Sequence, residues 1–216
     1  MGVRRAMDTV IEASRGNRIT YTLGPLIHNP HALEMLESRN VYVTDTIGEK
    51  LKGETVVIRA HGITLEKRGQ LREIGASVVD ATCPNVLRSQ GIIKKYHSRG
   101  YSIVIVGDRG HAEMDALLSY TGNTGMVVEN IEEARSLPPM EKVCVISQTT
   151  FNDSKYQEIA EEICNSSEEC YIAGTVCSST ERRQEDVRKL AKITDATVVV
   201  GGKTSANTKR LAEISI

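Results

Sequence analysis

The feature that most limits the fold is a regular alternation of short aliphatic strands and helices along the chain. Helical patterns cover residues 3–13, 31–38, 64–74, 86–98, 131–136, 154–163 and 177–191. Strand patterns occupy residues 19–23, 41–43, 54–60, 77–82, 101–106, 126–129, 142–147 and 197–200. The segment 101–106 is apolar almost throughout, as is typical of a strand buried on both faces of a parallel sheet. The alternation therefore predicts an α/β fold with mostly parallel sheets.

The composition agrees with sheets that helices cover on both faces. Hydrophobic residues make up 40% of the 216 positions and aromatic residues only 4%, so aliphatic side chains must fill the core. A net charge of −1 argues against nucleic acid or an anionic membrane as the main partner. No apolar run is long enough to predict a membrane span or a signal peptide. Five cysteines, an odd number, favour a reducing cytoplasm over a disulfide framework.

Two cysteines occupy the same kind of position, between the end of a strand and the start of a helix. Cys83 follows the strand at 77–82 and precedes Pro84, and Cys177 follows a short apolar run and precedes Ser178. A thiol at the amino end of a helix is favoured as the thiolate, the form that binds metals or attacks electrophiles. A similar distance upstream of Cys83, a helix begins near Gly2 with no cysteine before it. We therefore expect three repeated α/β domains, residues 1–82, 83–176 and 177–216, with the first lacking its ligand and the third incomplete.

Polar side chains follow most of the predicted strands, at the sheet edge where open α/β folds bind ligands. A histidine with a glutamate two positions later is the arrangement that proton delivery requires. Each residue taken singly could equally be an ordinary hydrogen-bonded loop residue, but their recurrence at strand ends is hard to explain by packing. The candidates are His28, His61, Cys83, His111 with Glu113, Thr149, Cys177, and Ser205 with Asn207. The remaining cysteines, Cys144, Cys164 and Cys170, are expected to be core or incidental residues.

The residues by themselves leave the chemistry of the cysteines open. Cys83 and Cys177 with a third thiolate would hold an iron–sulfur cluster, leaving one iron available to substrate. The same two thiolates with a histidine would bind zinc, and Cys83 with His111 could form a cysteine hydrolase. The run Gly201-Gly202-Lys203-Thr204 is not a Walker A motif. Its backbone N–H groups would still suit an anion.

Several motifs together resemble one family, the 4-hydroxy-3-methylbut-2-enyl diphosphate reductases. The resemblance extends over essentially the whole chain. The motifs, in order, are His28-Asn29, Ala60-His61-Gly62, Asp80-Ala81-Thr82-Cys83-Pro84, Gly110-His111-Ala112-Glu113, Gln148-Thr149-Thr150, Cys177 with Arg183-Gln184-Glu185, and Gly202-Lys203-Thr204-Ser205-Ala206-Asn207.

The resemblance implies three α/β domains around a central [4Fe-4S] cluster, to which each domain supplies one cysteine. Cys83 and Cys177 match the second and third ligands, whereas the first ligand of the family stands just before the position of Met1. The family also continues beyond the position of Ile216, with a further serine that contacts the substrate diphosphate. The sequence therefore resembles a fragment of such an enzyme.

The resemblance also implies the reaction, which is the last step of the non-mevalonate isoprenoid pathway. The hydroxyl group of (E)-4-hydroxy-3-methylbut-2-enyl diphosphate is removed reductively, with electrons from a ferredoxin or flavodoxin, to form isopentenyl and dimethylallyl diphosphates. Ala206 falls where some relatives carry another serine, so the resemblance does not carry over that hydroxyl contact, although a backbone N–H could still serve there. By resemblance Glu113 donates the proton, Thr149 orients it, His111 lines the pocket, and His28, His61, Ser205 and Asn207 hold the diphosphate. The alternatives are an inactive, cluster-free remnant that keeps only anion binding, and a zinc-dependent hydrolase.

Overall fold

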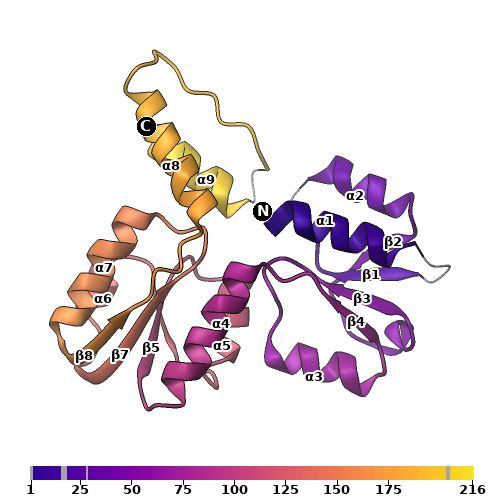
Figure 1. The fold of residues 1–216 in the computed structure, drawn as a ribbon, viewed down its shortest axis with the longest axis horizontal. Coiled ribbons are helices and arrows are strands. Elements are labelled where there is room, and N and C mark those ends of the chain that lie inside the picture. Colours follow the sequence, from indigo (N-terminus) through magenta and orange to yellow (C-terminus); the bar gives the residue numbers. More distant parts are fainter. Residues whose placement is uncertain (1, 16–18, 28, 203–204) are drawn as a thin grey trace. The chain divides into compact units, whose positions relative to one another are not determined.

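The computed structural model of the protein describes residues 2–15, 19–27, 29–202 and 205–216. The chain forms two compact units, residues 1–87 and 88–216, and each contains one four-stranded sheet (Figure 1). All strand pairs in both sheets are parallel, with helices between successive strands. The predicted α/β fold with parallel sheets is therefore confirmed. The division into three domains stays a prediction.

The first unit has the strand order β2-β1-β3-β4. Helix starts in this unit follow from local capping: Asn29 accepts a hydrogen bond from the N–H of Ala32, and Thr64 accepts one from the N–H of Lys67. The strands are β1 (Thr20–Leu23), β2 (Val41–Thr44), β3 (Thr55–Ile58) and β4 (Ser77–Asp80). The helices are α1 (Gly2–Ala13), α2 (Pro30–Glu37), the short 3-10 helix η1 (Glu49–Leu51) and α3 (Leu65–Glu73).

Helices pack on both faces of the first sheet, and its interior strand β3 has buried aliphatic residues on both faces. Val57 of β3 packs on one face with Ala6 and Val10 of α1, while Val56 packs on the other face with Leu71 of α3. Figure 1 shows α1 and α2 on one side of this sheet and α3 on the other. Because successive strand residues point to opposite faces, an interior strand covered on both faces, such as β3, is apolar at consecutive positions.

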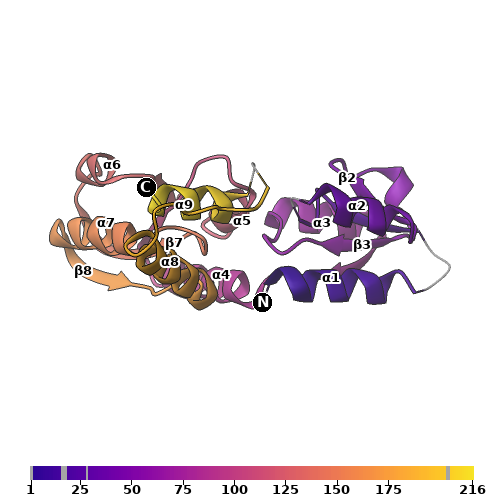
Figure 2. The same cartoon turned by 90° about the horizontal axis from the view of Figure 1, so that it is seen from above.

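The second unit repeats the same topology, with the strand order β6-β5-β7-β8. Its last two helices lie side by side (Figures 1 and 2). The strands are β5 (Ser102–Val106), β6 (Met126–Val128), β7 (Met140–Ser147) and β8 (Ser167–Ile172). The helices are α4 (Pro84–His97), which begins in the first unit, α5 (Ala112–Ser119), α6 (Ile131–Arg135), α7 (Asp153–Asn165), α8 (Ser178–Ala191) and α9 (Ala206–Ile214).

The second sheet is also covered on both faces. Val104 of β5 packs with Tyr156 of α7 on one face. Ile105, the next residue, packs with Ile93 of α4 and Leu117 of α5 on the other face. In each sheet the first strand in sequence lies in the interior, and the chain continues first to one side of it and then to the other. This reversal creates a switch point at the carboxyl ends of β5 and β7, where open α/β sheets bind ligands.

Three local features differ from the sequence-based expectations. Residues 197–200 form no strand, and Val198 and Val200 are 85% and 90% exposed, because the described residues supply no neighbouring strand to pair with them. A strand was expected to begin at Cys170, whereas β8 begins at Ser167 and includes the charged residues Glu168 and Glu169, as edge strands often do. Helix α5 was not among the expected helices, and Glu113 lies in its first turn.

Two cysteines expected to be incidental are bonded to each other. Cys164 at the end of α7 and Cys170 in β8 form a disulfide, with their Cα atoms 5.4 Å apart. Cys83, Cys144 and Cys177 remain outside any disulfide. The expectation that Cys164 and Cys170 are unrelated residues was wrong, because the turn after α7 returns the chain directly alongside that helix.

Reducing this disulfide is expected to lower the free energy of unfolding by about 2 kcal/mol, because the bond closes a short loop in the unfolded chain. The two cysteines are six positions apart. Thermal melting with and without a thiol reductant measures the effect. The double variant Cys164→Ala/Cys170→Ala is the control and should not respond to the reductant. Equal melting temperatures for the reduced and oxidised wild type would contradict the prediction.

Candidate active site

A buried contact joins Glu113 and Thr149, which follow the neighbouring strands β5 and β7. The backbone N–H of Thr149 donates to Oε1 of Glu113 over 2.7 Å, and its hydroxyl donates to Oε2 over 2.8 Å. Glu113 is 1% exposed and Thr149 is 6% exposed. The contact forms because β5 and β7 are parallel neighbours, so their carboxyl ends meet at one edge. Thr149 therefore binds both carboxyl oxygens of Glu113.

The environment of Glu113 makes it suitable for proton transfer. Burial raises the pKa of Glu113 to about 7, although the two hydrogen bonds from Thr149 oppose part of the rise. A carboxylic acid with a pKa near the working pH can both give up and regain a proton. Near neutral pH, the protonated and the ionised forms of Glu113 are therefore present in similar amounts.

His111 directly precedes the helix that carries Glu113. It is the N-cap of α5, and its Nδ1 accepts a hydrogen bond from the N–H of Glu113 over 3.2 Å. Since Nδ1 accepts, a neutral His111 carries its proton on Nε2. Gly110, with φ at +77°, makes the turn that allows this cap. A single helix start thus sets the orientation of both His111 and Glu113.

Cys177 is connected to the Glu113–Thr149 pair through a backbone hydrogen bond. It is the N-cap of α8, and its N–H donates to the carbonyl oxygen of Thr149 over 2.9 Å. Its Sγ lies 3.0 Å from the hydroxyl oxygen of Ser179, and the residue is partly exposed. The second unit therefore brings together three predicted site residues, with Thr149 in contact with both Cys177 and Glu113.

Cys83 has a comparable position in the first unit. It lies between β4 and α4, and its N–H donates to the carbonyl oxygen of Ala60 over 2.9 Å. A Cβ on Gly2 would lie only 3.1 Å from its Sγ, so the absence of a side chain at Gly2 lets α1 begin close to the sulfur. The thiol thus lies near the amino ends of α1 and α4, where backbone N–H groups favour negative charge.

His61 is near Cys83 along the edge of the first sheet. It follows β3 directly after Ala60, whose carbonyl oxygen binds the backbone of Cys83. Gly62, with φ at +77°, turns the chain there, and His61 is partly buried. The other predicted histidine of this unit, His28, lies outside the described residues.

Ser205 and Asn207 lie at the amino end of α9. Ser205 is the N-cap and accepts a hydrogen bond from the N–H of Thr208 over 3.4 Å. The side-chain oxygen Oδ1 of Asn207 is buried and has no hydrogen-bond partner among the described residues. Gly201 packs so closely against Thr208 that a side chain there would collide with it. The helix start therefore offers its first-turn N–H groups to an anion, whereas the unsatisfied Oδ1 of Asn207 is an acceptor that requires a donor such as water.

Two residues that were not predicted as site residues connect α8 and α9 to the loop that carries Thr149. Gln184 of α8 is fully buried and donates through Nε2 to the carbonyl oxygen of Phe151 over 2.9 Å. Arg210 of α9 lies over the ring of Phe151, 4.8 Å from its centroid. Gln184 occurred in a motif of the resemblance but without a role, and Arg210 had no signal apart from its place after Asn207. Their contacts depend on helices that are distant in sequence from Phe151.

The donor set is compatible with an iron–sulfur cluster as far as it is described. Cys83 and Cys177 are partly exposed thiols directly before helices, whereas Cys144 is buried in β7 and its pKa is raised by burial to about 12. Thiolates are the usual ligands of such clusters. Residues 2–15, 19–27, 29–202 and 205–216 contain no group of three or more Cys, His, Asp or Glu residues placed to hold a metal ion. A shared centre for Cys83 and Cys177, which lie in different units, therefore stays a prediction.

The described helices include none with both the length and the apolar character needed to cross a lipid bilayer.

Comparisons with known proteins agree on one family. The family model described as LytB protein matches residues 1–216. A relative in Caldanaerobacter subterraneus named 4-hydroxy-3-methylbut-2-enyl diphosphate reductase is 37% identical over 217 residues, covering 99% of this chain and 75% of the relative. A protein of the same name in a species of Anaeromyxobacter is 41% identical over 214 residues, with the same two coverages.

Two solved structures share the fold. The E-1-hydroxy-2-methyl-but-2-enyl-4-diphosphate reductase of Plasmodium falciparum matches with a TM-score of 0.92 and 26% identity, over 99% of this chain and 69% of that chain. A structure described as (E)-4-hydroxy-3-methyl-but-2-enyl diphosphate reductase, the terminal enzyme of the non-mevalonate pathway, matches with a TM-score of 0.78 and 38% identity. It covers 100% of this chain and 78% of that chain.

Proposed function

The chain belongs to the LytB protein family, and from this premise we propose that it reduces (E)-4-hydroxy-3-methylbut-2-enyl diphosphate to isopentenyl and dimethylallyl diphosphates. This is the last step of the non-mevalonate isoprenoid pathway, as the description of one structural relative states for that protein. The single observation that best supports the proposal is the buried Glu113 with a pKa of about 7, held by Thr149 at the switch point of the second sheet.

Cys83 and Cys177 are the residues that would hold a [4Fe-4S] cluster. When bound, the cluster would supply electrons one at a time and an open iron able to act as a Lewis acid toward the substrate hydroxyl. The electrons would come from a ferredoxin or a flavodoxin, proteins of the cytoplasm, where we place the reaction. In this proposal residues 1–82, 83–176 and 177–216 are three domains that each face the cluster.

Glu113 acts as the proton donor in this proposal. The overall reaction consumes two electrons and two protons, breaks the carbon–oxygen bond, releases water and leaves a new carbon–hydrogen bond. Burial keeps Glu113 protonated in a large share of molecules near neutral pH, so that it can protonate the departing oxygen. Thr149 keeps the carboxyl group in one orientation, and His111 lines the same pocket. The low exposure of Glu113 and Thr149 also excludes bulk water from the proton path.

The diphosphate is held by neutral donors and helix ends. Ser205 and Asn207 at the start of α9 supply N–H groups and side chains, and His28 and His61 supply ring nitrogens from the first unit. Asn207 would donate to the diphosphate through its Nδ2, and its unsatisfied Oδ1 would accept from a water molecule. Anions are stabilised at helix amino ends by the N–H groups and the helix dipole.

Anaerobic reconstitution with iron and sulfide, followed by metal analysis, tests the proposal. The wild-type protein is expected to retain about four irons per chain with thiolate-to-iron absorbance. Cys83→Ser and Cys177→Ser are each expected to lose most of that iron. Cys144→Ala is the matched control, because it removes a thiol whose pKa is raised to about 12, and it should retain the wild-type iron content.

The same measurement separates the alternatives. Zinc bound in place of iron, lost in Cys83→Ser and Cys177→Ser, would favour the zinc-dependent hydrolase. Neither metal, with diphosphate binding retained, would indicate the cluster-free remnant. Iron content unaffected by both serine variants would contradict the assignment of Cys83 and Cys177.

A further inference from the structure

We propose that Arg210 is a positioning residue, which holds the amino end of α9 against the two loops that carry the proton donor Glu113 and its partner Thr149. The inference rests on the proposed function, because it concerns how the diphosphate-binding residues Ser205 and Asn207 are kept in register with the proton donor.

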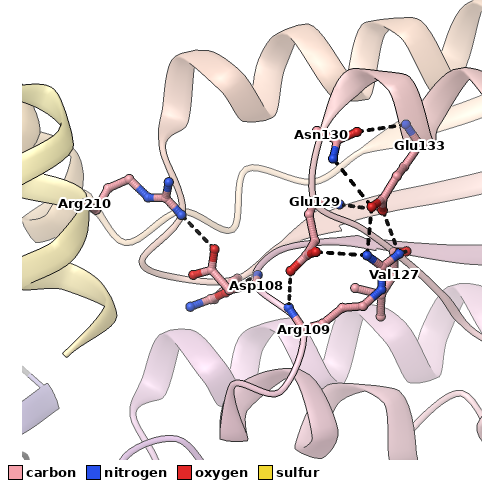
Figure 3. Close-up of polar contacts among 8 residues, drawn as sticks. Asp108, Arg109, Val127, Glu129, Asn130, Glu133 and Arg210 are labelled. Atoms are coloured by element: carbon pink, nitrogen blue, oxygen red, sulfur yellow. Dashed lines mark hydrogen bonds and ion pairs between the residues drawn. The ribbon is translucent and has the colours of Figure 1, made fainter. Parts of the chain in front are cut away.

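The surroundings of Arg210 differ from those of an ordinary surface arginine. Its side chain is 10% exposed, and its guanidinium group contacts the loop after β5, the loop after β7 and one residue of its own helix. Nη2 donates to Oδ1 of Asp108 over 2.9 Å, Nη1 donates to Oε2 of Glu213 over 2.7 Å, and the carbon Cζ lies 4.8 Å from the centroid of the Phe151 ring. Figure 3 shows the contact between Arg210 and Asp108. The planar, forked guanidinium can make such a stack and two ion pairs at once, whereas a lysine ammonium cannot.

Asp108 connects this contact to the loop after β5. Its N–H donates to Oε1 of Gln148 over 2.8 Å, and Gln148 directly precedes Thr149. Asp108 also lies in the short loop that ends at His111, the cap of the Glu113 helix. Its carboxylate is therefore fixed relative to both halves of the Glu113–Thr149 pair.

Phe151 connects Arg210 to the loop after β7. Phe151 is 2% exposed, its N–H donates to the carbonyl oxygen of Gln148 over 3.0 Å, and its own carbonyl oxygen accepts from Gln184. The Phe151 ring therefore packs in the hydrophobic core, and its backbone is bound by Gln184 of α8. Arg210 stacks on it one turn of helix after Asn207. Displacing Arg210 would shift the first turn of α9, and with it Ser205 and Asn207, relative to Glu113.

The adjacent arginine is a natural control. Arg109 lies in the same loop as Asp108, but its side chain is directed to β6 and α6, where it pairs with Glu129 over 3.0 Å and with Glu133 over 2.6 Å (Figure 3). Its side chain is 50% exposed. Removing Arg109 changes the net charge as much as removing Arg210 does, while none of its described hydrogen bonds or ion pairs involves α9.

The test measures binding of inorganic pyrophosphate to the protein by titration calorimetry. Arg210→Gln is expected to weaken binding about tenfold, since loss of positioning commonly has effects of this size or larger. Arg210→Lys should restore the charge without restoring the affinity, and Arg109→Gln should bind within about twofold of the wild type. Folding of each variant is checked by circular dichroism and melting.

The direction in which Asp108→Asn changes the affinity for pyrophosphate distinguishes positioning from electrostatics. It removes a negative charge near the anion, so a purely electrostatic effect would strengthen pyrophosphate binding, whereas a loss of positioning would weaken it. This variant also keeps the test informative if Arg210→Gln fails to fold. Unchanged or tighter binding by Asp108→Asn would overturn the inference alone. Absence of pyrophosphate binding by the wild type would instead overturn the diphosphate site of the proposed function, and the inference with it.

Discussion

Replacing Glu113 with Gln is expected to lower turnover of the cluster-containing enzyme at least about a hundredfold, because the side chain keeps its shape but can no longer supply a proton. Gln can accept the N–H of Thr149 and donate to its hydroxyl oxygen, so the pair should stay in place. Anaerobic assay with an artificial one-electron reductant, normalised to iron content, measures the loss. Activity within a few-fold of the wild type would remove Glu113 from the role of proton donor.

Glu113→Gln is also expected to change how folding stability depends on pH, an effect that does not require the iron–sulfur cluster. The pKa of Glu113 is about 7 in the folded state, against 4.5 for an ordinary glutamate. Below pH 4.5 the carboxyl group of Glu113 is protonated in both the folded and the unfolded chain, so its titration does not reduce the free energy of unfolding. Between pH 4.5 and 7 the unfolded chain loses its proton first, and folding stability falls by up to about 3 kcal/mol before levelling off. Glu113→Gln cannot titrate and should lose this decline, which urea unfolding at pH 5 and pH 8 would reveal.

Replacing Thr149 with Val is expected to lower turnover about tenfold or more and to move the pH profile of activity upward. The hydroxyl of Thr149 is one of the two donors that hold down the raised pKa of Glu113. Without it, the ionised carboxylate is less stabilised, so its pKa rises further and the protonated form persists to higher pH. The carboxyl group also loses the contact that orients it, which reduces the rate even where the group is protonated.

Thr149→Ser is the matched control for this prediction. Serine keeps both the backbone N–H and a hydroxyl donor, so turnover and the pH profile should stay close to those of the wild type. A decrease in Thr149→Ser as large as that in Thr149→Val, without a pH shift in Thr149→Val, would contradict the prediction. The hydroxyl contact would then have no part in tuning Glu113.

Much of the fold was predictable because local patterns are enough to specify parallel α/β units. Strands with long apolar runs, such as β5 and the part of β7 from Val143 to Ile146, are typically buried on both faces, and the helices between strands supply the cover. The strand at 197–200 shows the limit of such reasoning: its local pattern is that of a strand, but a strand requires a partner for its backbone groups. The disulfide between Cys164 and Cys170 shows another limit, since spacing alone does not specify which thiols meet.

The sequence by itself determined which residue types stand at the strand ends, and parallel pairing of β5 with β7 then brought Glu113 and Thr149 to one edge. Tertiary structure alone decided that Glu113 would be almost fully enclosed, because the cover over it comes from elements distant in sequence. It also decided that Arg210 would meet Phe151 and Asp108, which are about 60 and 100 positions away. A local pattern carries no information about such contacts, since the pKa of a carboxyl group and the placement of a helix depend on the whole packed neighbourhood.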